Sequence, residues 1–374
     1  MTPGRLLGVF AVLVIGGATA YAWLREDNLR APPPKEVAEA EKPAATPALS
    51  ESVDPAQQNK LTTSRPTDGA TIERQVMDDG QVVNKFTPRD RDGKGPIVID
   101  VDANRPQTPQ EAALPDPALI EETDNGPLPI IADDGTRPVD RYARPWSGAR
   151  GTRIAIVIAG LGLSQTGTQR AIRTLPEEIT LAFAANGNSL SRWMPEARRT
   201  GHEVLLQVPF EPFDYPDNDP GPLTLLHTDS AADSVDRLHE SMVKMTNYTG
   251  IMNFLGGRFL SDSKALEPVM RDIADRGLLF LDDGTSAQSL TGTFAKAMTM
   301  PHAFADLVLD TNVSQSAILE KLDDLERIAR RNGQAIGVAS AFDESIDAVA
   351  QWSQEASRRG IEIVGVSALA QTPN

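Results

Sequence analysis

The stretch SQSAILEKLDDLERIARRNG, residues 314–333, carries the signals of a helix that leads directly into a strand. Ser314 is a suitable N-cap residue. The apolar residues are spaced to share one helical face: Ile318, Leu322, Leu325 and Ile328. Arginines in the last turn complement the negative end of the helix dipole, and Gly333 supplies the left-handed residue that ends a helix. An apolar run begins directly afterwards, near Ala335, and predicts a strand.

The same helix stop recurs three more times, as RRTG before Val204, DRG before Leu278 and RRG before Ile361. A helix that ends directly before a strand, four times over, predicts repeated α-to-β units and a mainly parallel sheet. Strands are expected to begin near Ile154, Ile179, Val204, Gly250, Leu278, Leu307, Ala335 and Ile361. This pattern predicts an α/β fold, a distorted (β/α) barrel of about seven to eight units over residues 151–374. A doubly wound open sheet is the alternative.

The N-terminal part of the chain differs in composition. Residues 6–24, LLGVFAVLVIGGATAYAWL, carry no charge and are long enough to span a bilayer as a helix. We therefore expect a transmembrane signal anchor in residues 1–24, and a cleaved signal peptide is the alternative. Residues 25–150 hold 17 of the 28 prolines and predict a disordered, acidic tether. Within this tether, the apolar runs at 74–86 and 96–102 favour local β structure.

The overall composition restricts the classes of partner. The formal net charge of −16 argues against nucleic acid. The absence of cysteine excludes a disulfide framework, so the fold of an exported domain has to rest on its apolar core. The membrane is expected as a partner through the N-terminal helix alone.

Residues 201–222, GHEVLLQVPFEPFDYPDNDPGP, are the most informative about function. A buried strand ends here in a loop rich in acids, prolines and aromatics, and ligands of such folds bind at the C-terminal ends of strands. Glu211 and Asp282 are the candidate catalytic pair, with Asp283 as the alternative to Asp282. Such a pair could act as a general acid and base or as oxygen ligands of a metal. The alternative is that they hydrogen-bond their own loops. The candidate substrate-binding residues are Asn186, Phe213, Tyr215, Asp217, Asn253, Phe254 and Asp310.

Two other kinds of site find no support in the sequence. The histidines are His202, His227, His239 and His302, and no pair of them has the spacing of zinc ligands. There is no G-x-S-x-G motif for a serine nucleophile. We therefore expect no histidine-based metal site.

Several blocks of the chain, in order, resemble the divergent polysaccharide deacetylase family. RIAIVIAGLGLS resembles its opening strand, and GHEVLLQVPFEP resembles its GHEVLLHLPMEP block. TGIMNFLGGRF, GLLFLDDGTS and QAIGVASAFDESI resemble its GVNNHMGSRF, GLFFLDSRT and AIGIGHPxxET blocks. The resemblance implies a barrel-like (β/α) fold in an exported or anchored bacterial protein. It also implies polysaccharide deacetylation with a divalent metal, held by an aspartate and histidines, that activates water.

The chain departs from the family where the metal is bound. The family's pair of aspartates is replaced by Ala159 and Gly160. Its three histidines are replaced by Gln207, Phe254 and Ser340. Phenylalanine cannot bind a metal, and glutamine is a weak neutral ligand. We therefore expect no metal cofactor.

Two functions remain open. The first is a protein of the bacterial inner membrane, with its domain in the periplasm, that binds cell-wall glycan or an envelope protein without catalysis. The second is a hydrolase of polysaccharide or peptidoglycan with a rebuilt site made of Glu211, Asp282 and Asp310. Only this alternative would bring back a divalent metal such as zinc.

Overall fold

The computed structural model describes residues 70–76, 82–88, 108–149 and 151–370. The expected anchor, residues 1–24, and most of the expected tether lie outside these residues. Among the described helices, none is long and apolar enough to cross a membrane. The chain divides into two units, residues 1–93 and 94–374. The first holds an antiparallel hairpin of β1 (Ala70–Val76) and β2 (Val82–Pro88), where the sequence favours β structure.

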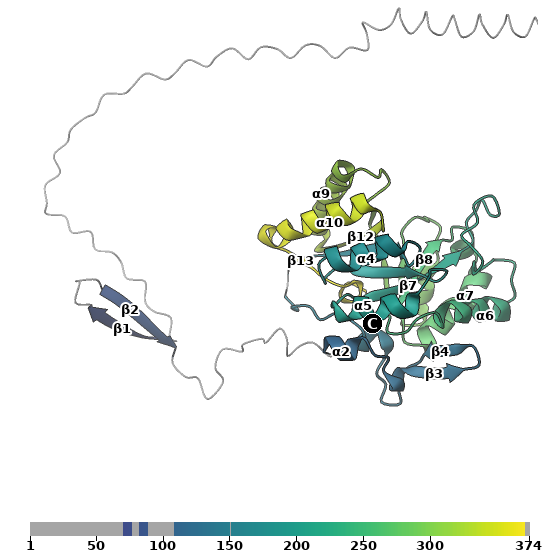
Figure 1. Cartoon of the computed structure of the whole chain (residues 1–374), viewed down its shortest axis with the longest axis horizontal. Coiled ribbons are helices and arrows are strands. Elements are labelled where there is room, and N and C mark those ends of the chain that lie inside the picture. The colour runs from purple at the N-terminus through teal and green to yellow at the C-terminus, as the bar shows by residue number, and fades with distance from the viewer. Residues whose placement is uncertain (1–69, 77–81, 89–107, 150, 371–374) are drawn as a thin grey trace, which may run out of the picture. The chain divides into compact units, whose positions relative to one another are not determined.

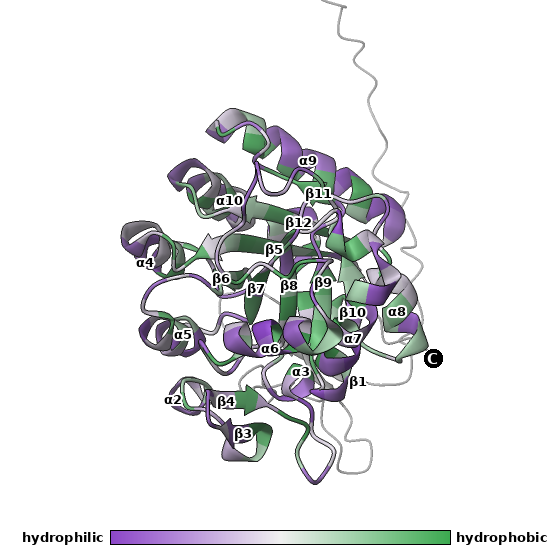
Figure 2. Cartoon of the chain, turned by 90° about the vertical axis from the view of Figure 1, so that its right-hand side faces the viewer, coloured by the Kyte–Doolittle hydropathy of each residue, from purple (hydrophilic) through white to green (hydrophobic). Residues whose placement is uncertain are grey.

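The second unit is built on a nine-stranded sheet in which every pair of strands is parallel. Its strands are β5 (Thr152–Leu161), β6 (Thr180–Ala184), β7 (Val204–Phe210), β8 (Gly250–Leu255), β9 (Leu279–Asp282), β10 (His302–Phe304), β11 (Leu307–Val308), β12 (Gln334–Ser340) and β13 (Ile361–Ile363). Eight of them follow the order β10-β9-β8-β7-β6-β5-β12-β11 and curl into a half-barrel, and β13 pairs with the start of β5. Figure 2 shows the hydrophobic strands enclosed by helices.

Helices alternate with the strands as the sequence predicts. They are α4 (Gln165–Thr174), α5 (Leu190–Arg199), α6 (Ala231–Met242), α7 (Ser263–Asp275), α8 (Thr291–Ala297), α9 (Gln315–Asn332) and α10 (Asp343–Ala356). Ser314 caps α9 by accepting a hydrogen bond from the backbone of Ala317, and Gly333 ends α9 at φ 85°. The α/β class and the parallel sheet are therefore confirmed, but the sheet is a half-barrel without ladder pairing between β10 and β11 among the described residues.

The strands separate two apolar clusters because successive side chains point to opposite faces. Ile154, Ile156 and Ile158 of β5 face the larger cluster under the helices. Ala155 and Val157 face a smaller cluster inside the half-barrel. That inner cluster also contains residues from outside the strands: Val139, Val364, Val366 and Leu369. The C-terminal segment therefore helps to fill the interior.

Residues 108–149, which we expected within the tether, pack against the half-barrel instead. They form α2 (Pro109–Ala112), η2 (Pro117–Leu119), β3 (Ile120–Thr123), β4 (Gly126–Pro129) and α3 (Pro138–Arg141), next to α5 and α6 (Figure 1). Asn247 donates hydrogen bonds to the carbonyls of Ala112 and Leu114, at 2.9 and 2.8 Å. Leu128 is buried in the larger cluster. For this part of the chain the expectation of an unfolded tether is wrong.

Candidate functional site

Glu211 directly follows β7 at the C-terminal ends of the strands, which we call the mouth of the half-barrel. Its carboxylate is buried and accepts two hydrogen bonds of 2.7 Å from His227, one from the backbone N–H and one from Nδ1. Nε of Arg258 lies 3.4 Å from its other oxygen. Its backbone carbonyl accepts from the N–H groups of Arg258 and Phe259. Glu211 therefore connects the loop after β7 to the loop after β8.

Asp282, the last residue of β9, is fully buried. One carboxylate oxygen accepts hydrogen bonds of 2.6 Å from the hydroxyls of Ser289 and Thr291, and the other accepts from the N–H of Gly284 at 2.9 Å. These bonds fix the loop between β9 and α8. Asp282 therefore hydrogen-bonds its own loop, which is the alternative that we considered from the sequence.

His302 extends this network from β10. Its Nε2 lies 3.1 Å from Oγ1 of Thr291. Because the Thr291 hydroxyl already donates to Asp282, Nε2–H of His302 is the donor to Thr291. The ring stacks on Phe280 at a centroid distance of 6.2 Å and meets the Phe304 ring edge-on at 4.5 Å. Burial lowers the pKa of His302 to about 4, although the negative charge of Asp282 acts to raise it. The ring is therefore neutral at pH 7.

Asp310 and Asn253 are also used internally. Asp310 is buried and accepts hydrogen bonds from the backbone of Ser340 at 2.6 Å and from the Ser345 hydroxyl at 3.0 Å. The Asn253 amide donates to the carbonyl of Leu255 and accepts from the N–H of Asp283. These side chains therefore hold strand ends in place, and both polar groups of the Asn253 amide are engaged.

The carboxylates proposed as a rebuilt site do not form one cluster. Glu211 bonds to the loops after β7 and β8, Asp282 to the loop after β9, and Asp310 to β12 and α10. Among the hydrogen bonds of residues 108–149 and 151–370, none joins these three. Asp283 differs from them, because burial raises the pKa of its carboxyl group, while hydrogen bonds from Thr285 oppose the shift. From the sequence, Asp282 and Asp283 are equivalent candidates as the partner of Glu211, and only their different surroundings in the structure separate them.

The residues at the family's metal positions do not fit a metal. The backbone N–H of Gly160, at φ 76°, donates to Oε1 of Gln207 at 3.0 Å, so the carbonyl oxygen of Gln207 already has a partner. Phe254 has no ligand atom and is 43% exposed. Ser340 contributes its N–H to Asp310. In the part of the chain that the structure describes, no group of three His, Asp or Glu side chains is arranged to hold a metal ion.

The remaining candidate residues lie on the surface of the mouth. Phe213, Asn186 and Asp217 are exposed, and Tyr215 is half-buried. The ring of Phe213 lies on the backbone of Gly257, where a Cβ would come within 2.9 Å of it. The Asn186 side chain lies equally close to Gly221. The loops after β6, β7 and β8 therefore contact one another, which is needed if their candidate residues are to share one site.

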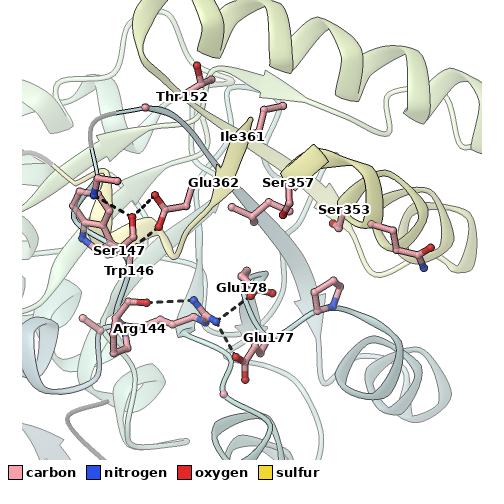
Figure 3. A pocket seen from close by; sticks show the side chains of 18 of the residues that line it. Arg144, Trp146, Ser147, Thr152, Glu177, Glu178, Ser353, Ser357, Ile361 and Glu362 are labelled. Atoms are coloured by element: carbon pink, nitrogen blue, oxygen red, sulfur yellow. Dashed lines mark hydrogen bonds and ion pairs between the residues drawn. The ribbon is translucent and has the colours of Figure 1, made fainter. Parts of the chain in front are cut away.

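A cavity of about 1020 Å³ lies at the opposite end, the base of the half-barrel (Figure 3). It is bounded by Thr152 and Ile361, the first residues of β5 and β13. Arg144 reaches Glu177 and Glu178 at 3.0 and 3.2 Å. Ser147 bonds Glu362 through both its N–H and its hydroxyl. This cavity was not predictable from local sequence, because segments far apart in the chain form it.

Comparisons with known proteins agree with the sequence blocks. The family described as Divergent polysaccharide deacetylase matches residues 156–370. The uncharacterized protein YibQ of Escherichia coli K12 is 23% identical over 200 residues, which is 53% of this chain and 61% of YibQ. An uncharacterized protein of Haemophilus influenzae is 25% identical over 218 residues, which is 58% of this chain and 76% of that protein.

A solved structure is more similar. The crystal structure of the uncharacterized protein ATU2773 from Agrobacterium tumefaciens C58 has 69% sequence identity and a TM-score of 0.65. The likeness covers 66% of this chain and all of that one. Since the family match spans more than half of the sequence and includes the C-terminal end of every strand in the sheet, this chain belongs to the divergent polysaccharide deacetylase family.

Proposed function

We propose that this protein binds a ligand at the mouth of its half-barrel and does not remove acetyl groups from polysaccharide. One observation carries the proposal: the side chains at the family's metal positions, Gly160, Gln207, Phe254 and Ser340, offer no ligand set. Activation of water at neutral pH needs a metal or a free general base of suitable pKa. A neutral amide already bonded to Gly160 supplies neither.

The buried carboxylates support the same proposal. A general base must reach the proton that it abstracts, which requires an unengaged oxygen facing the substrate. Glu211 is paired with His227 and Arg258, and both oxygens of Asp282 accept hydrogen bonds from their own loop. Moving either carboxylate toward a substrate would leave buried donors without partners, at a cost of about 1–3 kcal/mol each.

The proposed setting is the bacterial envelope. The uncharged apolar residues 6–24 support a membrane anchor or an export signal, and the net charge of −16 disfavours nucleic acid. Cell-wall glycan and an envelope protein are the two partner classes that this setting offers. No metal cofactor is part of the proposal.

A hydrolase with a rebuilt site is the second candidate, and Asp283 favours it. A carboxyl group with a raised pKa at a strand end has the property of a general acid. In this candidate, Asp283 would donate a proton to the leaving group, and a second carboxylate would have to activate water.

Acetate release separates the two candidates. The purified full chain is incubated with N-acetylated chitooligosaccharides and with peptidoglycan fragments, with and without added Zn²⁺, beside an active deacetylase as positive control. We expect no acetate above the buffer control. Acetate release that is lost in Asp283→Asn and retained in the control Asp124→Asn, an exposed carboxylate between β3 and β4, would overturn the proposal in favour of the second candidate.

A further inference from the structure

Exposed apolar side chains gather at the mouth of the half-barrel. Eight large apolar side chains are exposed in residues 108–149 and 151–370, by 37–63%. Two of them, Leu114 and Ile131, lie in the N-terminal segment. The other six lie at the C-terminal ends of strands β5, β7, β8, β10, β11 and β12 or in the loops that follow them, and we call them the mouth patch: Leu163, Phe213, Phe254, Phe304, Val313 and Phe342. Parallel strands end on one edge of a sheet, so these six share one end of the molecule.

Local contacts hold parts of the mouth patch in place. Phe213 rests on Gly257, and its carbonyl accepts a hydrogen bond of 2.6 Å from Arg258. Phe304 packs edge-on against His302. Exposed apolar groups that are fixed before binding lose little conformational entropy when a partner covers them. A gathering of this kind marks a site of association rather than a random surface.

Three acidic side chains lie in the same loop as Phe213 of the mouth patch. Asp214, Asp217 and Asp219 are exposed in the loop after β7, and none of them forms an ion pair within the described part of the chain. Arg258, which contacts the same loop, is engaged with Glu211 and with the carbonyl of Phe213. The surface therefore complements a partner that is basic as well as apolar.

The polar groups argue against a glycan at this surface. Sugar hydroxyls need free hydrogen-bonding groups beside the aromatic rings. Asn253 and Asp282, the polar side chains at the ends of β8 and β9, are instead satisfied within the protein, and the polar groups exposed beside Phe213 are carboxylates. Exposed carboxylates also repel acidic glycans, and they repel a second copy of this chain in the same way.

We infer that the mouth patch is a docking surface for the basic, apolar face of a protein partner. The inference rests on the proposed function, because it names the class of ligand that the mouth binds. Aromatic side chains with large exposed area are the usual centres of such interfaces. Phe254 stands where the family has a metal-binding histidine, so the same position would have changed from catalysis to contact.

Binding of the purified full chain to labelled peptides tests the inference. The probes are an amphipathic leucine–lysine peptide and a leucine–glutamate peptide of the same pattern, followed by fluorescence anisotropy, and N-acetylated chitotetraose, followed by calorimetry. We expect the lysine peptide to bind at least about tenfold more tightly than the glutamate peptide. The double variant Phe254→Ala/Phe342→Ala should weaken that binding at least about tenfold. The matched control Leu114→Ala/Ile131→Ala removes exposed apolar groups elsewhere and should leave it unchanged.

A second variant tests the charges. Asp214→Asn/Asp217→Asn/Asp219→Asn alters exposed groups only, so it should fold normally while it weakens lysine-peptide binding and reduces its salt dependence. Equal affinity for both peptides, or weakening by the control variant as strong as by the Phe254/Phe342 variant, would overturn the inference. So would chitotetraose binding that is lost in the Phe254/Phe342 variant. Any of these three binding results, obtained without acetate release, would overturn the docking inference and leave the proposed function standing. Acetate release would overturn the proposed function itself.

Discussion

At the scale of single residues, the Glu211 carboxylate shows how burial and pairing determine a role. It accepts two hydrogen bonds from His227 and lies beside Arg258, although it is only 4% exposed. A buried carboxylate is stable only when partners of this kind surround it. We therefore assign Glu211 to the architecture of the mouth rather than to chemistry.

The change Glu211→Gln tests this assignment. It removes the negative charge opposite Arg258 and replaces one acceptor oxygen by an NH₂ group, so we expect a loss of about 2 kcal/mol in the free energy of unfolding. Denaturant unfolding measures it. Glu240→Gln, the same change at an exposed helix position, is the control and should be neutral. A Glu211→Gln protein as stable as the parent would contradict the assignment.

His302 makes the stability depend on pH. Burial lowers its folded pKa to about 4, below the ordinary value of about 6.5 in an unfolded chain. Between pH 4 and 6.5 the unfolded chain binds more protons than the folded one. The stability that neutral His302 contributes to the folded state is therefore fully present above pH 6.5. It is lost as the pH falls toward 4, by up to about 3 kcal/mol. Burial lowers the pKa of His202 as well and acts in the same direction, whereas the raised pKa of Asp283 acts in the opposite one.

Unfolding measured at a series of pH values, in the parent and in His302→Gln, checks this expectation. We expect a shallower loss of stability between pH 6.5 and 4 in the variant, and an NMR titration of the parent should place the midpoint of His302 well below 6. Identical pH slopes in the two proteins would show that His302 is not the group responsible.

At the scale of elements, the helix stops before the strands were predictable because they depend on local chemistry. Gly333 ends α9 in a left-handed conformation, and Gly360 does the same at the end of η4 (Ser357–Arg359). Strand β10 was missed, because HAF at 302–304 is too short to show a period and only Ala305 and Asp306 separate it from β11. Its pairing with β9 is a tertiary effect that the local sequence does not encode.

Gly333→Ala isolates the contribution of one helix stop. A Cβ at this position would meet nothing within 4 Å, so the whole effect comes from the left-handed backbone, and we expect about 1 kcal/mol of destabilisation. Gly151→Ala is the matched control, since it also has open space but no left-handed φ. Thermal unfolding of both proteins distinguishes them, and equal melting temperatures would be the contrary result.

At the scale of the whole molecule, the boundary of the folded unit lies earlier than composition suggests. Proline-rich composition predicted a tether to residue 150, but Leu128, Val139 and Tyr142 are buried in the second unit. The carbonyl of Tyr142 also accepts a hydrogen bond from the buried guanidinium of Arg198. Burial of this kind depends on partners distant in sequence, such as Arg198, and composition does not reveal it.

A chain that begins at Gly151 should therefore be less stable than one that begins at Thr108. Loss of three buried apolar side chains, at about 1.5–3 kcal/mol each, predicts a decrease of several kcal/mol. Denaturant midpoints of the two chains measure it. Equal stability would mean that residues 108–149 contribute nothing to the fold.

The sequence located the mouth correctly but not the state of its side chains. The motif blocks placed Glu211, Asn253 and Asp282 at strand ends, where the structure has them. Whether a carboxylate is free or already bonded depends on residues such as His227, Thr291 and Ser289 in other loops. The exposed aromatics of the mouth patch were only partly foreseen, because exposure is a property of the assembled surface.

Loss of the family's metal site is tested by a calorimetric titration of the purified, metal-free full chain with Zn²⁺, beside an active polysaccharide deacetylase. We expect no stoichiometric tight binding of zinc, because Gln207, Phe254 and Ser340 provide no ligand set. One tightly bound zinc ion per chain, lost in Asp282→Asn or Asp283→Asn, would contradict it.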